Sequence, residues 1–224
     1  MELHTGTHDV VHMWGMAFNM DTIYMTWVVF AIIIVVAFFA TRQVNMVPSG
    51  VQNVVEFFLE AIGSQLKGPL GKHFSKVSSL LFTFFVFILV SNELGLIPSP
   101  HILTSPTNDL NTTLGLALAS SVSIWVIGAK MKGPSYFKHF FQPFAVFVIF
   151  HIMEEISKPV TLSFRLFGNI VAGEIVLELL NGLAPYLTPI IWLVFSLFVG
   201  VIQAFVFTIL VTSYLGMAIN DEEH

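Results

Sequence analysis

The chain has 224 residues, of which 55% are hydrophobic and only 10% are charged, and its mean hydropathy is +0.83. Soluble domains are about a quarter charged, so these values exclude a soluble protein and predict one integral membrane domain over residues 1–224. The formal net charge of −5 excludes little, because its distribution across the bilayer matters more than its sum. The absence of cysteine excludes disulfides, thiolate catalysis and Cys-ligated metal centres.

The first segment, residues 1–21, is polar and contains no Lys or Arg. It therefore lacks the basic region of a signal peptide, and we expect a tail outside the membrane. His4, His8 and His12 recur at helical spacing and could hold a metal ion on one face. The residues between them form helices poorly, so a solvated tail is the preferred interpretation.

Five apolar runs are long enough to cross a bilayer, and one shorter run is amphipathic. The predicted elements are membrane helices at 23–40, 77–97, 110–130, 139–180 and 189–219 and an interfacial helix at 51–66. The alternative for the amphipathic run is one arm of a membrane-buried hairpin. We expect a turn at Gly68-Pro69 after this run. Asp109 is expected to cap the helix after it, and Glu93 is interpreted as a simple interfacial carboxylate. The predicted fold is an all-α integral membrane protein.

The fourth membrane run is too long for an upright span. A helix of about forty residues measures about 60 Å, which is twice the thickness of the hydrocarbon core. It must therefore tilt steeply, bend near Pro143 or Pro159, or lie partly along the interface.

The basic residues predict the orientation of the chain. Seven of the nine Lys and Arg residues lie around two of the connections, after the first and third spans. The tail and the other two loops contain none. Because basic loops stay on the cytoplasmic side, we expect the N-terminus outside and the C-terminus in the cytoplasm.

Residues 157–180 place several charges inside an apolar run, where ionisable groups are costly and usually functional. At about 100° per residue, Arg165 and Asn169 share one helical stripe, whereas Glu174 and Glu178 fall on the opposite face.

Two of the charged residues in this helix differ in their local partners. Lys158 can pair with Glu154 one turn earlier, in the favourable order with the acid first. No acid lies one turn from Arg165, so a simple intrahelical pair does not account for this residue.

Four stretches of this sequence, SKPVTLSFRLFGNIVAGE, SPTNDLNTTLGLALA, KMKG and VIQAFVFTILVTSYL, closely resemble subunit a of bacterial F-type rotary ATP synthases. The likeness runs from about Thr104 to Ala218, and RLFGN followed by GE is highly specific. It implies that Arg165 is the family's essential arginine and that Gln203 is the family's glutamine on the last helix. It also implies partners, namely a ring of c subunits beside the last two, tilted helices, the b subunits of the peripheral stalk, and the lipid bilayer. It implies no nucleic acid partner, no cofactor, no metal and no catalysis by this chain alone.

The resemblance implies a path for protons, or for Na⁺, in a bacterial cell membrane. A guanidinium stays charged at working pH, so Arg165 would block leakage and favour the ionised form of a ring carboxylate facing it. Asn169 and Gln203 could orient the guanidinium without adding charge. The residues assigned to the outside path are Glu174, Glu178 and Ser196, and those assigned to the inside path are Glu154, Glu155 and His151. The last-helix stripe expected to line the groove is Ser196, Gly200, Gln203 and Phe207.

The sequence departs from the family in one respect. Members with a histidine one or two turns before the glutamine use it in the outside path, whereas this chain offers Ser196, and Glu178 is expected to compensate. Two other classes of protein are alternatives. A secondary transporter binding an anionic substrate at Arg165 would need repeats and broken helices, which are not evident. A redox enzyme with haem at His139 and His151 would need a facing histidine on a second helix.

Overall fold

The computed structural model describes residues 10–13, 15–42, 45–97, 104–133, 136, 147–183 and 187–220. Its elements in these ranges are β1 (Val10–Met13), β2 (Met16–Asn19), α1 (Met20–Thr41), α2 (Val51–Leu70), the 3₁₀ turn η1 (Gly71–His73), α3 (Phe74–Gly95), the 3₁₀ turn η2 (Pro106–Asn108), α4 (Leu110–Lys132), α6 (Phe147–Leu183) and α7 (Thr188–Ile219). Three features of the sequence lie outside the described residues, namely His4 and His8 of the tail, the alternative bend at Pro143 and the candidate haem ligand His139.

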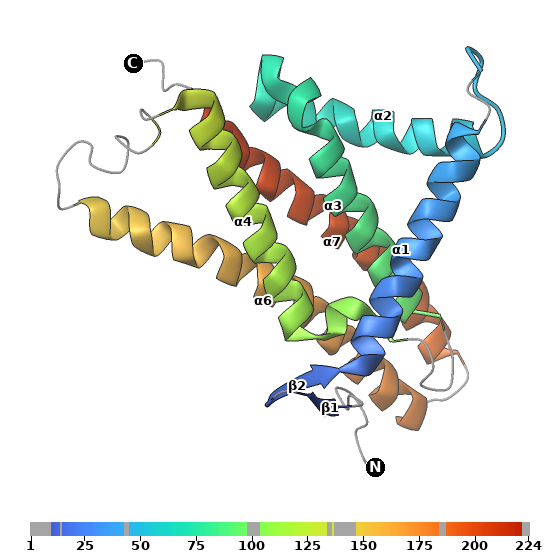
Figure 1. The fold of residues 1–224 in the computed structure, drawn as a ribbon. Coiled ribbons are helices and arrows are strands. Elements are labelled where there is room, and N and C mark those ends of the chain that lie inside the picture. The colour runs from blue at the N-terminus through green and yellow to red at the C-terminus, as the bar shows by residue number, and fades with distance from the viewer. Residues whose placement is uncertain are drawn as a thin grey trace.

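Five helical segments within the described ranges are long and apolar enough to cross a membrane, and this confirms the predicted all-α membrane fold. In Figure 1, α2 lies across one end of α1 and α3, whereas α6 and α7 run obliquely past α4. The 37 residues of α6 correspond to about 55 Å of helix. Helix α6 continues through Pro159 without ending and runs obliquely past α4 (Figure 1), which agrees with the tilt that was one expectation for its length.

The end of α2 differs from the sequence prediction. The expected turn at Gly68-Pro69 is wrong, because the helix includes both residues and ends at Leu70. Gly71 follows with φ of 49°, a conformation that suits glycine, and its N–H donates to the carbonyl of Lys67. Pro69 has no backbone N–H, so α2 loses one helical hydrogen bond at this residue. The full burial of Leu66 and Leu70, where α2 packs on α7, favours continuation of the helix.

An antiparallel hairpin precedes α1, where the sequence predicted only a tail. Strands β1 and β2 pair across a turn in which Gly15 has φ of 78°. His12 lies on β1 opposite Ala17, so it does not stand on a helical face. Asn19 Nδ2 donates to Asp109 Oδ2 at 2.7 Å, which ties the hairpin to the start of α4.

The centre of the bundle is formed by α3 and α7, with α4 packed on both α6 and α7. Leu81 and Ile88 of α3, Phe207 and Val211 of α7, and Leu166 of α6 are fully or almost fully buried. Between helices in a membrane, such packing stabilises through van der Waals contact, because lipid tails are as apolar as leucine.

Small and polar groups adjust the contacts of α4. Ser120, Ser121 and Gly128 are buried on this helix, whereas Ser123 is half-buried. Asp109 accepts a hydrogen bond from the backbone N–H of Asn111 at 2.8 Å, which confirms the predicted N-terminal cap.

The two ends of the bundle are distinct. The hairpin and η2 lie at one end of the molecule in Figure 1, and α2 and the end of α7 lie at the other. Polar features at the first end therefore belong to the side that carries Val10 to Asn19.

Candidate functional site

A hydrogen-bonded network of uncharged side chains joins α3, η2 and α7. Asn92 Nδ2 donates to the carbonyl of Gly200 at 3.2 Å, and Thr107 Oγ1 donates to Asn92 Oδ1 at 2.8 Å. Ser105 Oγ donates to the carbonyl of Ser91 at 2.8 Å and lies 2.6 Å from Thr107 Oγ1. These side chains are buried, so their mutual satisfaction holds the segment before α4 against the helix pair.

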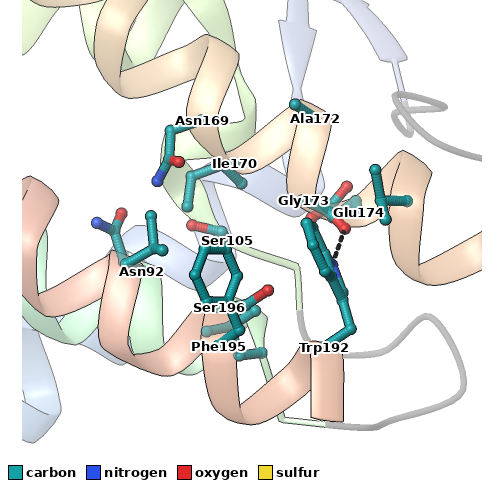
Figure 2. A pocket seen from close by; sticks show the side chains of 14 residues that line it. Asn92, Ser105, Asn169, Ile170, Ala172, Gly173, Glu174, Trp192, Phe195 and Ser196 are labelled. Atoms are coloured by element: carbon teal, nitrogen blue, oxygen red, sulfur yellow. Dashed lines mark hydrogen bonds between the residues drawn. The ribbon is translucent and has the colours of Figure 1, made fainter. Parts of the chain in front are cut away.

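A cavity of about 150 Å³ opens beside this network, which is room for several water molecules. Figure 2 shows Asn169 and Glu174 of α6 around it, with Ser196 of α7 on another side. The structure thus brings together three of the predicted site residues. Sequence reasoning missed the contribution of Asn92 and Ser105, whose only signal was polarity at the ends of an apolar run.

The carboxylate of Glu174 has a partner on η2. Asn108 Nδ2 donates to Glu174 Oε2 at 2.6 Å, so the η2 turn just before α4 also positions this acid. Trp192 Nε1 donates to the carbonyl of Gly173 at 3.0 Å and clamps α7 to α6 (Figure 2). Glu178 is half-buried one turn beyond Glu174 and does not line the cavity.

Arg165 lies on the outer surface of α6, where it is exposed beside the exposed Phe164. Among the described residues, no acid forms an ion pair with its guanidinium. A charged group on an apolar surface at membrane depth requires a partner from outside the chain or access to water.

The stripe of α7 that was expected to line a groove faces the inside of the bundle over most of its length. Ser196 lines the cavity, whereas Gly200, Gln203 and Phe207 are buried within the bundle. Gln203 Nε2 is buried and has no hydrogen-bond partner among the described residues. An amide in this state is a site for a water molecule, because an unsatisfied buried donor is costly.

A second polar cluster occupies the first half of α6. Lys158 Nζ lies 3.1 Å from Glu154 Oε1, which confirms the predicted pair, and 2.6 Å from Glu155 Oε1. Glu155 also accepts a hydrogen bond from Trp125 Nε1 of α4. The ammonium group lies over the ring of Tyr214, 5.3 Å from its centroid, and this helps to hold α6 on α7.

The remaining predicted residue of this cluster is His151, which is half-buried one turn before Glu155. Tyr136 is buried nearby, against Gly128. Burial raises the pKa of the Tyr136 phenol above its ordinary value, and the charge of Glu155 raises it further, while Lys158 opposes both. The tyrosine is therefore a neutral hydrogen-bonding group beside the acids.

Two separated sets of carboxylates result, with Arg165 between them on one helix. Glu155 precedes Arg165 by ten residues and Glu174 follows it by nine, so each set lies about 14 Å away along the axis. No continuous row of ionisable side chains on α6 joins the two sets.

The fold and this site define a class, namely a polytopic membrane protein with separated polar regions and a charged residue on its apolar surface. The chain belongs to the ATP synthase A chain family, whose sequence model matches residues 23–216. It is 39% identical to "ATP synthase subunit a" of Desulforamulus reducens over 225 residues, which cover 95% of this chain and 85% of the relative. It is 36% identical to "ATP synthase subunit a" of Gloeobacter violaceus, with 99% of this chain and 92% of the relative covered.

Proposed function

We propose that this chain is the ion-conducting stator subunit of the membrane sector of a bacterial ATP synthase. It provides two offset half-channels for protons, or for Na⁺, and Arg165 separates them. The chain catalyses no reaction by itself. The observation that carries the proposal is the exposed Arg165, which lies between two sets of carboxylates on a tilted helix.

The outer half-channel runs through the cavity. Its polar groups are Glu174, held by Asn108, together with Asn169 and Ser196. Glu178 extends this set by one helical turn. Water in the cavity would hydrate Glu174, so that this acid can exchange protons with the side that carries the hairpin.

The inner half-channel begins at the other cluster. Glu154 is the accessible acid there, with a side chain that is 58% exposed, whereas Glu155 is held by Lys158 and Trp125. His151 stands one turn nearer the start of α6. The unequal exposure supports Glu154 as the exit group and Glu155 as a structural support for Lys158.

Arg165 drives release at the meeting point of the two paths. An opposite charge within about 4–6 Å raises the acid dissociation constant of a carboxyl group by about 10- to 1000-fold. A ring carboxylic acid arriving at the guanidinium therefore loses its proton. The guanidinium does not itself give up a proton, so it cannot pass one directly between the half-channels.

The exposed apolar faces of α6 and α7 are the surface for a ring of c subunits. Val160 and Phe164 of α6 and Val194 and Phe198 of α7 are exposed on these helices and suit a partner of apolar helices. The b subunits of the peripheral stalk and lipid would cover other surfaces. The basic loops orient the chain with its N-terminus outside and its C-terminus in the cytoplasm.

Replacement of Arg165 tests the proposal. Arg165→Ala should abolish ion-driven ATP synthesis while the complex still assembles, because the side chain is exposed and its loss opens no buried cavity. Arg42→Ala, at an exposed arginine just after α1, is the matched control and should retain activity. Synthesis is measured in membrane vesicles with the amount of assembled complex determined in parallel. Retention of more than a small fraction of coupled synthesis by the Arg165 variant would refute the assignment.

A further inference from the structure

Glu93 occupies a place that the sequence did not indicate. A Cβ atom on Gly200 would stand 2.8 Å from Glu93 Oε1 and 3.4 Å from Asn92 Cβ. The carboxyl group of α3 therefore fills the space that the missing side chain of Gly200 leaves on α7. The interpretation of Glu93 as a simple interfacial carboxylate does not fit this position.

The carboxyl group of Glu93 has one oxygen, Oε1, that is buried and makes no hydrogen bond to the described residues. Helix α7 contains no Asp, Glu, Lys, Arg or His, so it cannot neutralise the carboxylate. The charged and titratable residues on the elements that pack on α3 are Asp21 and Tyr24 of α1, Glu56, Glu60 and Lys67 of α2, Lys72 and His73 of η1, Asp109 next to η2, and Tyr214 of α7. Within the described part of the chain, none of them forms an ion pair with Glu93.

The neighbours of Glu93 place it between the cavity and a second unsatisfied group. Asn92, the preceding residue, lines the cavity and donates to the carbonyl of Gly200. Gln203, whose buried Nε2 has no hydrogen-bond partner among the described residues, follows Gly200 by three residues on the same face of α7. Along α7, Ser196 at the cavity, Gly200 at the carboxylate and Gln203 therefore follow one another at single-turn intervals. A water molecule between Glu93 and Gln203 would satisfy both orphaned groups.

We infer that Glu93 is a proton-binding group of the outer half-channel, which carries protons from the cavity toward Gln203 and the ring carboxylates. The inference rests on the proposed function. The Glu93 carboxylate accepts a proton from a hydronium ion in the cavity, which becomes water, and Glu93 becomes the neutral acid. It then releases that proton to water on the Gln203 side, which passes it to a ring carboxylate and regenerates the Glu93 carboxylate. Gly200 is required because any side chain there would displace the carboxyl group.

Passive proton conductance of the assembled membrane sector in vesicles tests this role. Glu93→Gln keeps the shape and hydrogen-bonding capacity of the side chain but cannot exchange a proton. We expect it to lower conductance about tenfold, less than the factor of about 10² or more that one positioned proton-transfer group can contribute, because cavity water keeps part of the path open. Glu93→Asp should retain most of the conductance. Glu60→Gln, at an exposed acid of α2, is the control and should leave conductance unchanged.

A second variant leaves the acid in place. Gly200→Ala should assemble, since alanine favours helix, and should lower conductance severalfold because the carboxyl oxygen must retreat by about 0.6 Å, from 2.8 to 3.4 Å. It decides the matter if the Glu93 variants fail to assemble. Normal conductance in Glu93→Gln, or in Gly200→Ala, would overturn the inference and leave Glu93 with a packing role.

The Arg165 experiment separates this inference from the proposed function. Loss of coupled synthesis in Arg165→Ala together with normal conductance in Glu93→Gln refutes only the role of Glu93. Retained synthesis in Arg165→Ala refutes the proposed function itself.

Discussion

The contact between Gly95 and Ser105 supports a sharp prediction about how the loop before α4 positions the cavity. A Cβ atom on Gly95 would stand 2.5 Å from Ser105 Cβ and 3.0 Å from its backbone N and Cα, whereas ordinary contact begins at 3.4 Å. Gly95→Ala therefore requires Ser105 to retreat by about 0.9 Å, the difference between 3.4 and 2.5 Å. Overpacking of this kind costs about 1–3 kcal/mol. The shift strains the Ser105–Ser91 and Asn108–Glu174 hydrogen bonds, both of which depend on this loop.

The matched control is Gly173→Ala, since Gly173 also lines the cavity on a helix but has no atom within 4 Å of its Cβ position. In thermal unfolding of the purified membrane sector, we expect Gly95→Ala to lower the midpoint by at least about 2 °C. Gly173→Ala should leave the midpoint unchanged or raise it, because alanine is the better helix former. Proton conductance should fall only in Gly95→Ala. Equal midpoints and conductances for the two variants would show that the loop does not position the cavity.

Two further predictions concern the acids of α6. Glu174→Gln and Glu178→Gln should each reduce proton conductance modestly and the double variant severely, because acids one turn apart can substitute for each other; mild and additive losses would contradict this redundancy. In this cysteine-free chain, Glu154→Cys should react with an impermeant thiol reagent only from the cytoplasmic side and Glu178→Cys only from the outside, in right-side-out and inverted vesicles compared directly. Labelling of both positions from one face would mean a single vestibule.

The membrane helices were predictable because their signal is local. Runs of apolar residues predicted the five long segments. The position of Asp109 directly before one of these runs predicted that it caps the helix. The Lys158–Glu154 pair followed from spacing of one turn. The length of α6 indicated that it cannot stand upright in a bilayer, but length alone did not choose between a tilt, a bend and a course along the interface.

The features that sequence reasoning missed depend on contacts between distant segments. Nothing local distinguishes Glu93 from an interfacial acid until Gly200, more than a hundred residues later, is seen to leave room for its carboxyl group. The network of Asn92 with Thr107 likewise joins two elements across a loop. At Pro69, the burial of Leu66 and Leu70 of α2 against α7 outweighed the local preference for a turn.

The end of α7 is held by contacts that leave it little freedom to slide. The carbonyl of Pro69 stands 2.7 Å from the Cβ position of Gly216 and accepts a hydrogen bond from Asn220 Nδ2 at 2.8 Å. Lys132 Nζ at the end of α4 donates to the carbonyl of Asn220 at 2.5 Å. A rotor turning against the slanted helices would push them sideways at every step. Because these contacts join the end of α7 to α2 and α4, a sideways force on α7 in the proposed rotary complex would be shared by all three helices.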